Sequence, residues 1–479
     1  MVNDIRAASR AAGLSRADAE TVERLAKVYA DTSAKNVLRT RYYDMEQRVD
    51  DLGISVPPHL RGLRQSIGWP KKAVESLAAR SQFDGYTCID DEAASKLQEI
   101  VAANGMKRKY RKLVRNELKH SCAFMTVTAT GDGRAPRPLV SAYPATAAAA
   151  LWDYGASRIE CGLVVSATAK RGGESVPVAV DVYTAEAVIG LRNGAGGWAA
   201  EYRPHSMGRC LMEPMAHDAT LEKPFGTSRI TKAVMDITDD AVRASRRAEI
   251  AAEFMTAPQK YLLGADKDAL DGLSKWDAYI GAIFAVSKDG DNDTPQFGQL
   301  PQGTLQPHID YMRALAARFS SETNVPLSEL GIVSDNPSSA EAIYAAKESM
   351  IVDAQNLNAD NAEALRDVAL MALAVADGTD FETQAGRGLG IRAKFKNPAI
   401  PSVASQGDAI LKAIQAFPWM AESDVALEEA GFGDDQIQRL RNDRAKAAGR
   451  QIVAQYAGGL GIASDPARAA EEAARDIGR

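Results

Sequence analysis

One dense basic motif stands out among the residues whose types and spacing could do chemistry. It is MKRKYRK, residues 106–112, in which five of seven residues are Lys or Arg and one, Tyr110, is aromatic. Basic runs with an interleaved aromatic residue are typical of surfaces that contact phosphate or lipid head groups. A solvated helix face at the end of a helical section is the alternative interpretation.

Motifs for nucleotide hydrolysis, metal binding and nucleophilic catalysis are missing from the sequence. No Gly-Lys-Ser/Thr follows a strand pattern, and the glycines of RNGAGGW (192–198) and AGRGLGIR (385–392) are expected in loops or hairpins. DGDNDT (289–294) resembles the start of a calcium loop, but it lacks the glycine and the twelfth-position glutamate, so we expect a solvated turn. There is no Gly-x-Ser-x-Gly elbow, although a triad assembled from distant segments stays open. The histidines are isolated and fit no zinc motif: His59, His120, His205, His217 and His308.

We therefore expect no catalytic residue, no metal and no cofactor, and a structural or assembly role gains weight. The 479-residue chain is long enough for two to four domains. Its net charge of −6 argues against a protein that coats nucleic acid or anionic membrane, so any DNA contact must be local or weak. Four scattered cysteines without CxxC spacing indicate free buried thiols in a reducing compartment. No apolar leader and no run of 18 apolar residues is present, so we expect a soluble chain that is not secreted by this route.

The elements expected from periodicity change in character along the chain. The first 120 residues predict helices, and residues 121–227 predict strands bounded by Gly, Pro and Asp. A helix follows from Ser228 to the Ala257-Pro258 break, and a second helix carries Leu305 and Phe319 on one side. A small irregular module with short strands, residues 258–303, lies between these two helices. The helical stretches expected in the first section are 17–31, 34–50, 57–66, 71–80 and 91–103.

A long helix is expected after the turn Asp335-Asn336-Pro337. Ser338 and Glu341 form a capping box, and no Gly or Pro follows before Gly378, which predicts a helix of about 40 residues, roughly 60 Å long. An extended segment, GIRAKFKNPAIPS, comes next, and residues 405–475 are expected to be helical, with a helix, turn and helix in SDVALEEAGFGDDQIQRLRNDR.

The segment at residues 36–86 contains the pair Tyr42-Tyr43 and then Gly68-Trp69-Pro70, which leads a helix that ends in Arg80. In this pattern it resembles the N-terminal signature of portal proteins from tailed bacteriophages of the long-tailed siphophage type. Three further segments resemble the same family in the same order: FGTSRITKAVMDITDDAVRASRRAE, GQLPQGTLQPHIDYMRALAARFSSETNVPLSELGI, and IPSVASQGDAILKA with LEEAGFGDDQIQRL. Together they cover about residues 20–455. The signature residues are Asn36, Arg41, Tyr42, Tyr43, Leu52, Gly53, Pro57, Gly68, Trp69, Pro70, Arg80 and Gly85, with Asp408 and Gly431 near the end.

This resemblance implies an α+β, mostly α fold in a ring of twelve subunits at one capsid vertex, around a channel for double-stranded DNA. It divides the chain into a mixed α/β wing (1–227), a stem helix (228–257), a clip insertion (258–303), a second stem helix (304–323), a tunnel loop (324–337), a long helix with its wing return (338–400), and a helical crown with the tail (401–479). A mostly neutral or acidic channel wall would let the duplex slide, because each neutralised phosphate adds affinity.

The resemblance also implies the functional residues, which fall in three groups. The residues expected in the DNA channel, on the tunnel loop, are Asn324, Ser328, Ser334, Asp335 and Asn336. Those expected at the stem and subunit interface are Lys232, Asp239, Asp240, Arg243, Arg246 and Arg247. Those expected to dock partners on the clip are Lys260, Tyr261 and Lys288.

The partners implied are further copies of the chain, double-stranded DNA bound without sequence specificity, the terminase large subunit, a head-completion or adaptor protein, and the major capsid and scaffolding proteins. No membrane partner is expected. The protein is expected in the virion, at the portal vertex, and in the host cytoplasm during assembly. Two alternatives stay open: another phage capsid or tail protein, which should lack the helix, insertion and helix at 228–322, and a DNA-processing enzyme, which should show a metal-chelating carboxylate cluster.

Overall fold

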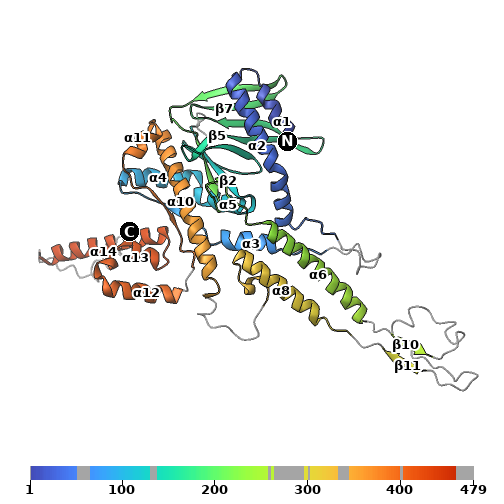
Figure 1. Cartoon of the computed structure of the whole chain (residues 1–479). Helices are drawn as coiled ribbons and strands as arrows, with labels where there is room; N and C mark the ends of the chain where they lie inside the picture. Colours follow the sequence, from blue (N-terminus) through green and yellow to red (C-terminus); the bar gives the residue numbers. More distant parts are fainter. Residues whose placement is uncertain are drawn as a thin grey trace, which may run out of the picture. The chain divides into compact units, whose positions relative to one another are not determined.

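The structure is a computed structural model of the whole chain (Figure 1). It describes residues 2–50, 65–129, 137–256, 260–263, 296–299, 303–332, 345–399 and 403–459. Contacts divide the chain into one unit of residues Met1–Pro398 and a second of residues Ala399–Arg479. Each unit is described by itself.

A five-stranded antiparallel sheet with helices on one face forms the first layer of the larger unit. Its strands follow one another in chain order as β4 (Ala148–Asp153), β5 (Arg158–Arg171), β6 (Glu174–Tyr183), β7 (Ala187–Gly194) and β8 (Gly197–Pro204). Figure 1 shows helices α1 (Val2–Ala7) and α2 (Arg16–Tyr43) over this sheet, with the short 3₁₀ turn η1 (Ala8–Arg10) between them. Leu25 of α2 packs with Leu163 and Val180 of the sheet in one buried cluster.

The second layer of the larger unit consists of a three-stranded sheet, of order β3-β2-β9, and the helices packed against it. Its strands are β3 (Leu139–Pro144), β2 (Cys122–Thr128) and β9 (Met212–Ala216), and β2 is buried along nearly its whole length. The helices of this layer are α3 (Trp69–Ala78), α4 (Asp91–Asn104), α5 (Met106–His120) and α10 (Glu348–Asp377), of which α5 and α10 contact β2 directly. The order of helices first and strands after is thus confirmed.

Two expectations for the first 120 residues were wrong. The stretch 17–31 and the first part of the stretch 34–50 belong to the single helix α2, which ends at Tyr43, so residues 44–50 are not helical. Residues Phe83–Thr87 form strand β1, which pairs antiparallel with β12 (Arg392–Phe395) in the expected extended segment. The pairing joins residues about 300 positions apart, so no local signal could reveal β1. The expected helix at 57–66 lies almost wholly outside the described residues.

Two antiparallel helices form a hairpin that carries a small strand ladder. Figure 1 shows α6 (Lys232–Thr256) beside α8 (Gln306–Thr323), with strands β10 (Lys260–Leu263) and β11 (Gln296–Gln299) beyond their ends. The ladder pairs Lys260 with Gln299 and Leu263 with Gln296. Ala241, Ala244 and Leu315 form the buried contact between the two helices. The predicted helix, insertion and helix are therefore present, and α6 ends at Thr256, one residue before the Ala257-Pro258 break.

The long helix α10 is shorter than the sequence predicted. It has 30 residues, begins at Glu348 after a turn at Ala346-Lys347, and ends as expected at Gly378, which is left-handed with φ 69°. The capping box at Ser338 and Glu341 lies outside the described residues. The C-terminal half of α10 is buried on all sides, from Val368 to Val375. Helix α11 (Phe381–Gly386) follows it.

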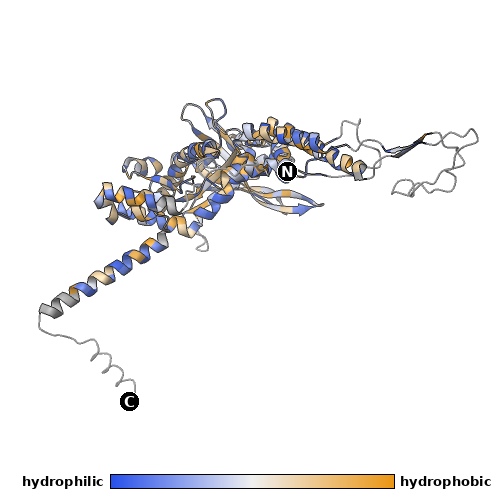
Figure 2. Ribbon diagram, turned by 90° about the horizontal axis from the view of Figure 1, so that it is seen from below, coloured by the Kyte–Doolittle hydropathy of each residue, from blue (hydrophilic) through white to orange (hydrophobic). Residues whose placement is uncertain are grey.

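The second unit is a set of helices with few buried side chains. It contains α12 (Val403–Ala416), the 3₁₀ helix η5 (Pro418–Glu422), α13 (Asp424–Glu429) and α14 (Asp434–Gly459). Ser423 caps α13, and Gly431, with φ 88°, makes the turn into α14, so the expected helix, turn and helix is confirmed. Figure 2 shows hydrophilic and hydrophobic residues mixed along α14. Among its described side chains only Ala426 and Ile437 are buried hydrophobic residues.

Candidate functional site

Four consecutive residues, Gly226-Thr227-Ser228-Arg229, lead the chain into the helical hairpin. Gly226 has φ 68°, and a side chain there would collide with the backbone of His217. The Thr227 amide donates to the His217 carbonyl at 2.7 Å, and His217 Nδ1 lies 2.7 Å from the Thr227 carbonyl oxygen. Glycine is required at 226 because the two backbone segments approach so closely in a left-handed turn.

Ser228 fixes this segment to the end of α5. Its hydroxyl donates to the Lys119 carbonyl at 2.6 Å and accepts from the Ile230 amide at 3.0 Å. The Arg229 amide donates to the Leu118 carbonyl at 2.8 Å. Carbonyl groups in the last turn of a helix lack hydrogen-bond partners within the helix. The bonds from Ser228 and Arg229 therefore supply donors to the last carbonyls of α5, and they also fix the direction in which α6 begins.

The Arg229 guanidinium joins three further helices at the base of the hairpin. Its Nε donates to the Ala73 carbonyl of α3 at 2.8 Å, and its other nitrogens reach the Thr323 carbonyl of α8 and, at 3.3 Å, the Asp353 carboxylate of α10. Burial lowers the pKa of Arg229, and Asp353 counteracts this shift. An arginine side chain remains charged in proteins, so the bonds from its three nitrogens hold α3, α8 and α10 to the start of α6.

Asn324 continues this junction beyond α8. It takes a left-handed conformation, φ 53°, at the end of the helix, and its amide donates to Asp353 at 3.1 Å. Asp353 therefore accepts from both Arg229 and Asn324. The first residue of the expected tunnel loop is thus bound to the long helix.

The first half of the expected tunnel loop is packed against the rest of the unit. Val325 is fully buried, and residues 327–330 form the 3₁₀ helix η4 (Leu327–Leu330). Glu329 accepts from Ser76 at 2.8 Å and pairs with Lys72 at 3.2 Å. These bonds and the nearby Arg80 lower the pKa of Glu329, although partial burial opposes the shift. Ser328 is exposed on η4, and Ser334, Asp335 and Asn336 lie outside the described residues.

The charged residues of α6 are largely bound within the chain. Asp239 accepts from the Tyr42 hydroxyl at 3.0 Å, and Arg243 donates to the Asp50 carbonyl at 3.1 Å and pairs with Asp240 at 3.0 Å. Arg246 is buried beside the Val49 carbonyl, 3.4 Å away. Residues 44–50, expected to be helical, are not, and the carbonyls of Val49 and Asp50 accept from Arg246 and Arg243 of α6.

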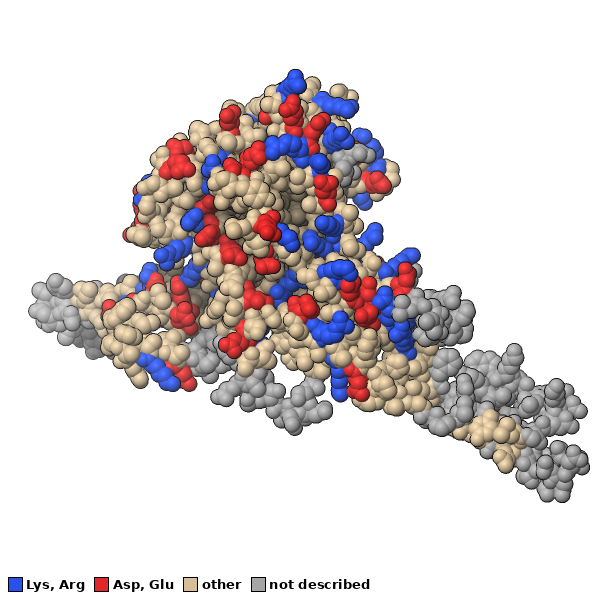
Figure 3. Space-filling view, in the orientation of Figure 1, with Lys and Arg blue, Asp and Glu red and all other residues tan. Residues whose placement is uncertain are grey.

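Two of the expected interface residues remain accessible on α6. Lys232 is exposed, and among the described residues its ion-pair partner is Asp236, one turn away on the same helix, at 2.7 Å. Arg247 is half-buried and forms no ion pair among the described residues. Over the face drawn in Figure 3, Lys and Arg side chains lie among Asp and Glu side chains, as the near-neutral balance suggests. The interface role of all six residues stays a prediction.

Residues of the strand ladder are the third expected group. Lys260 and Tyr261 belong to β10, and Tyr261 is 44% exposed opposite Gly298 of β11. Lys288 lies outside the described residues. Their role in docking stays a prediction.

The N-terminal signature packs against the hairpin. Trp69, at the start of α3, stacks on Phe319 of α8 with ring centroids 5.3 Å apart, and it also contacts the Ala241 and Leu315 cluster. Tyr43 donates to Glu75 of α3 at 2.5 Å, and Arg80 donates to the Pro398 carbonyl at 3.0 Å. Trp69 therefore packs against the hairpin, and Arg80 binds Pro398, the last residue of the larger unit.

A buried polar network between α5 and α10 escaped the sequence analysis. Asn361 of α10 donates to the Tyr110 hydroxyl and to Glu117 of α5, both at 3.0 Å, and Ser81 bonds Tyr110 at 2.7 Å and Asn358 at 2.6 Å. Burial raises the pKa of Glu117 to about 8, against the effect of the Asn361 bond. Tyr110, which the sequence placed in a basic run, is thus fully buried. The helical spacing of Tyr110, Leu113 and Glu117 was the available signal.

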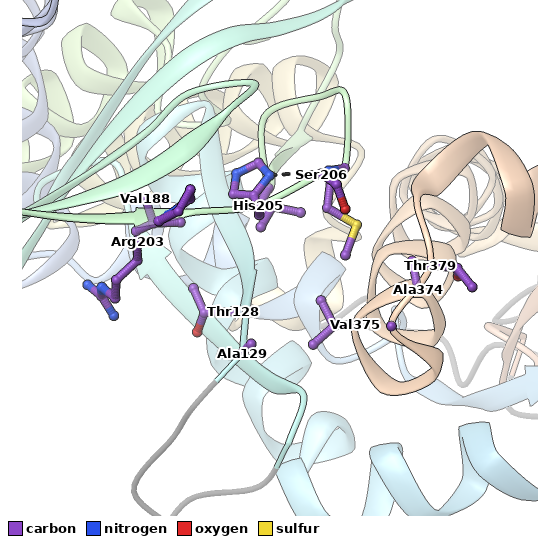
Figure 4. A pocket seen from close by; sticks show the side chains of 13 residues that line it. Thr128, Ala129, Val188, Arg203, His205, Ser206, Ala374, Val375 and Thr379 are labelled. Atoms are coloured by element: carbon purple, nitrogen blue, oxygen red, sulfur yellow. Dashed lines mark hydrogen bonds between the residues drawn. The ribbon is translucent and has the colours of Figure 1, made fainter.

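One pocket lies where β2, the β7–β8 edge and the end of α10 meet (Figure 4). Thr128, Val188, His205 and Val375 line it. Burial lowers the pKa of His205, and its Nε2 has no hydrogen-bond partner among the described residues. Within the described residues no group of His, Cys, Asp or Glu is arranged to hold a metal, and no helix is long and apolar enough to cross a membrane.

Comparison with known proteins assigns the family. The sequence model of the family described as "Phage portal protein, SPP1 Gp6-like" matches residues 18–449. The chain belongs to this family. It is a phage portal protein with the portal fold, as its N-terminal signature, hairpin and terminal helices indicated.

Curated relatives carry the same description over nearly the whole chain. The portal protein of Mycobacterium phage L5 is 27% identical over 441 residues, which cover 89% of this chain and 88% of the relative. The portal protein of Mycobacterium phage D29 is 25% identical over 439 residues, with the same coverage.

Solved structures with a similar chain come from gene transfer agent (GTA) particles. "Neck of native GTA particle computed with C12 symmetry" is 14% identical with a TM-score of 0.42, over 75% of this chain and 89% of that chain. "Neck of empty GTA particle computed with C6 symmetry" is 13% identical with a TM-score of 0.45, over 83% of this chain and 93% of that chain.

Proposed function

We propose that this portal protein assembles into a ring of twelve copies at one capsid vertex and forms the channel through which double-stranded DNA is packaged and ejected. The observation that carries the proposal is the α6–α8 hairpin with its β10–β11 ladder, in a chain that belongs to the portal family. Family membership favours this function over a capsid or tail protein and over a DNA-processing enzyme. The role is structural, and ATP-driven movement of DNA comes from a partner.

The hairpin is suited to line a channel because its base is rigid. Arg229 binds carbonyls of α3 and α8 and the carboxylate of α10, so α6 cannot tilt without breaking charge-assisted bonds. Lys232 and Arg247 on α6 are accessible for pairing with a neighbouring copy. Residues 324–337 follow the C-terminal end of α8 in sequence, and the loop would project into the channel there, with its bound first residues, 324–330, fixing its position.

The strand ladder is the proposed docking site for the terminase large subunit and the head-completion or adaptor protein. It lies between the two hairpin helices in sequence and presents the exposed Tyr261. The wing would face the major capsid and scaffolding proteins. This function places the chain in the virion, at the portal vertex, and in the host cytoplasm during assembly.

The assembly state is tested by native mass spectrometry of the purified full-length chain. We expect an oligomer of twelve copies, weakened in a Lys232→Glu/Arg247→Glu variant and unchanged in a Lys170→Glu/Arg171→Glu control, whose positions lie exposed on β5. Because single exposed pairs contribute only about 0–1 kcal/mol, the effect should be largest at low protein concentration. A wild-type chain that stays monomeric across salt and concentration would refute the ring.

The docking site is tested by deleting residues 266–296 and measuring terminase binding. We expect the deletion to abolish binding while the wing keeps its thermal transition. Unchanged terminase binding would show that docking occurs elsewhere.

A further inference from the structure

Helix α5 has an excess of positive charge that the packing of the unit does not require. It carries seven Lys or Arg residues and one carboxylate, Glu117, in its 15 residues. Its buried residues include Tyr110, Leu113, Val114 and Leu118. Glu117 is buried and its pKa is raised to about 8, so near neutral pH it adds little negative charge. The helix is therefore a concentrated positive surface in a chain of net charge −6.

Four of the seven cations have partners within the chain. Lys107 pairs with Asp84 at 2.8 Å, and Arg115 pairs with Glu75 at 2.9 Å. The Lys109 amine donates to the carbonyl of Val140 on β3. Lys119 lies 4.7 Å from the centre of the Tyr43 ring. These four cations stabilise the packing of α5 and have no need of an external ligand.

The remaining three cations lie together and exposed. Arg108, Arg111 and Lys112 form no ion pair among the described residues. They occupy positions i, i+3 and i+4, which adjoin on one face of a helix. Burial and the charge of Arg108 both lower the pKa of the adjacent Lys109, which agrees with a positive local potential. Three clustered cations that no carboxylate of a described residue neutralises repel one another, so an anion bound across them would be stabilised.

A cleft rich in hydrogen-bond donors adjoins this face. It encloses about 350 Å³ between α5 and β3. Lys112 and Asn116 line it from the helix, and Ser141 and Tyr143 contribute hydroxyl groups from the strand. Amines, hydroxyls and amides are the groups that proteins direct to phosphate oxygens, and no carboxylate of a described residue lines the cleft.

We propose that Arg108, Arg111 and Lys112, together with the cleft between α5 and β3, form a surface that binds the phosphate backbone of duplex DNA without sequence specificity. The surface lies apart from the hairpin and loop, so it goes beyond the proposed function, on which it rests only for the choice of duplex DNA as the polyanion. It would retain DNA at the wing while the near-neutral hairpin lets DNA slide.

The test measures binding of the full-length protein to a short, fluorescently labelled DNA duplex of mixed sequence by anisotropy across a salt series. The variant is Arg108→Gln/Arg111→Gln/Lys112→Gln. Removing one phosphate-binding cation should lower the slope of log affinity against log salt by about 0.9, so we expect a reduction of about 2 to 3 and a more than tenfold weaker affinity at low salt. Each single variant should lower the slope by about 1.

The matched control is Lys170→Gln/Arg171→Gln/Lys223→Gln, which removes the same charge from exposed positions on β5 and the 219–225 loop. It should leave the slope within error of the wild type. An equal reduction in the control, or an unchanged slope in the test variant, would overturn the proposal. Displacement of the duplex by polyglutamate at equal charge concentration would instead assign the surface to an acidic protein and would also overturn it. Ring formation is measured separately, so failure here leaves the proposed channel untouched.

Discussion

Glu117 should make the stability of the larger unit fall as the pH rises. Burial raises the pKa of its carboxyl from the ordinary value of 4.5 to about 8. Between these two values the folded state binds one more proton than the unfolded state, so the free energy of unfolding decreases by about 1.4 kcal/mol per pH unit. At pH 7 the cost of keeping this carboxyl protonated is about 3 kcal/mol.

Replacing Glu117 by Gln removes that cost and keeps the shape of the side chain. The amide carbonyl can still accept from Asn361, as Oε2 of the Glu117 carboxyl group now does at 3.0 Å. Two acceptors, Glu117 Oε1 and Asn361 Oδ1, are buried without a hydrogen-bond partner among the described residues, and the new NH₂ group places a donor in this network. We therefore expect Glu117→Gln to stabilise the unit by up to about 3 kcal/mol at pH 7 and by almost nothing near pH 4.5.

The assay is thermal unfolding, followed by circular dichroism between pH 5 and pH 8.5, with Glu99→Gln as the control. Glu99 is exposed on α4 and removal of its carboxylate changes the net charge equally. The wild type and the control should lose stability in parallel as the pH rises, whereas Glu117→Gln should show a flatter profile. The reasoning would be refuted if Glu117→Gln were less stable than the wild type at pH 7, or if its gain in stability over the wild type were largest at acidic pH.

Three further substitutions test the base of the hairpin. Asp353→Ala should destabilise the unit by about 1.5–3 kcal/mol in denaturant unfolding, because it leaves the Arg229 charge buried without its carboxylate; an unchanged midpoint would contradict the role given to this junction. Gly226→Ala should cost at least about 1 kcal/mol and lower soluble expression, since its left-handed turn lies against a neighbouring backbone; wild-type stability would show that the turn relaxes freely. Arg246→Glu should destabilise the isolated chain, whereas Arg247→Glu should not, because only the first guanidinium is buried; equal melting temperatures would argue against the placement of residues 44–50 along α6.

Local signals in the sequence predicted much of this fold. The apolar spacing of α6 and α8, the break at Ala257-Pro258 and the left-handed Gly378 each act within a few residues, so they specify elements and ends without tertiary information. The family resemblance rested on residues such as Trp69 and Gly226, whose packing and backbone conformation now explain why those types occur there.

The features that the sequence did not reveal depend on distant partners. Strand β1 exists because β12 pairs with it, and the charge of Arg229 is buried because carbonyls and a carboxylate from three other helices converge on it. Arg246 is likewise buried, beside the carbonyl of Val49, which is distant in the sequence. For the expected channel and docking residues, the sequence indicated only the segment of the chain in which they lie. Their contacts depend on residues that are distant in the sequence.

Electron microscopy of the purified full-length chain tests the central claim most directly. The account predicts end-on views of a closed ring with a central hole and twelvefold rotational symmetry, in which the α6–α8 hairpin surrounds the hole. Particles without a central opening, or rings with the hairpin on their outer rim, would contradict it.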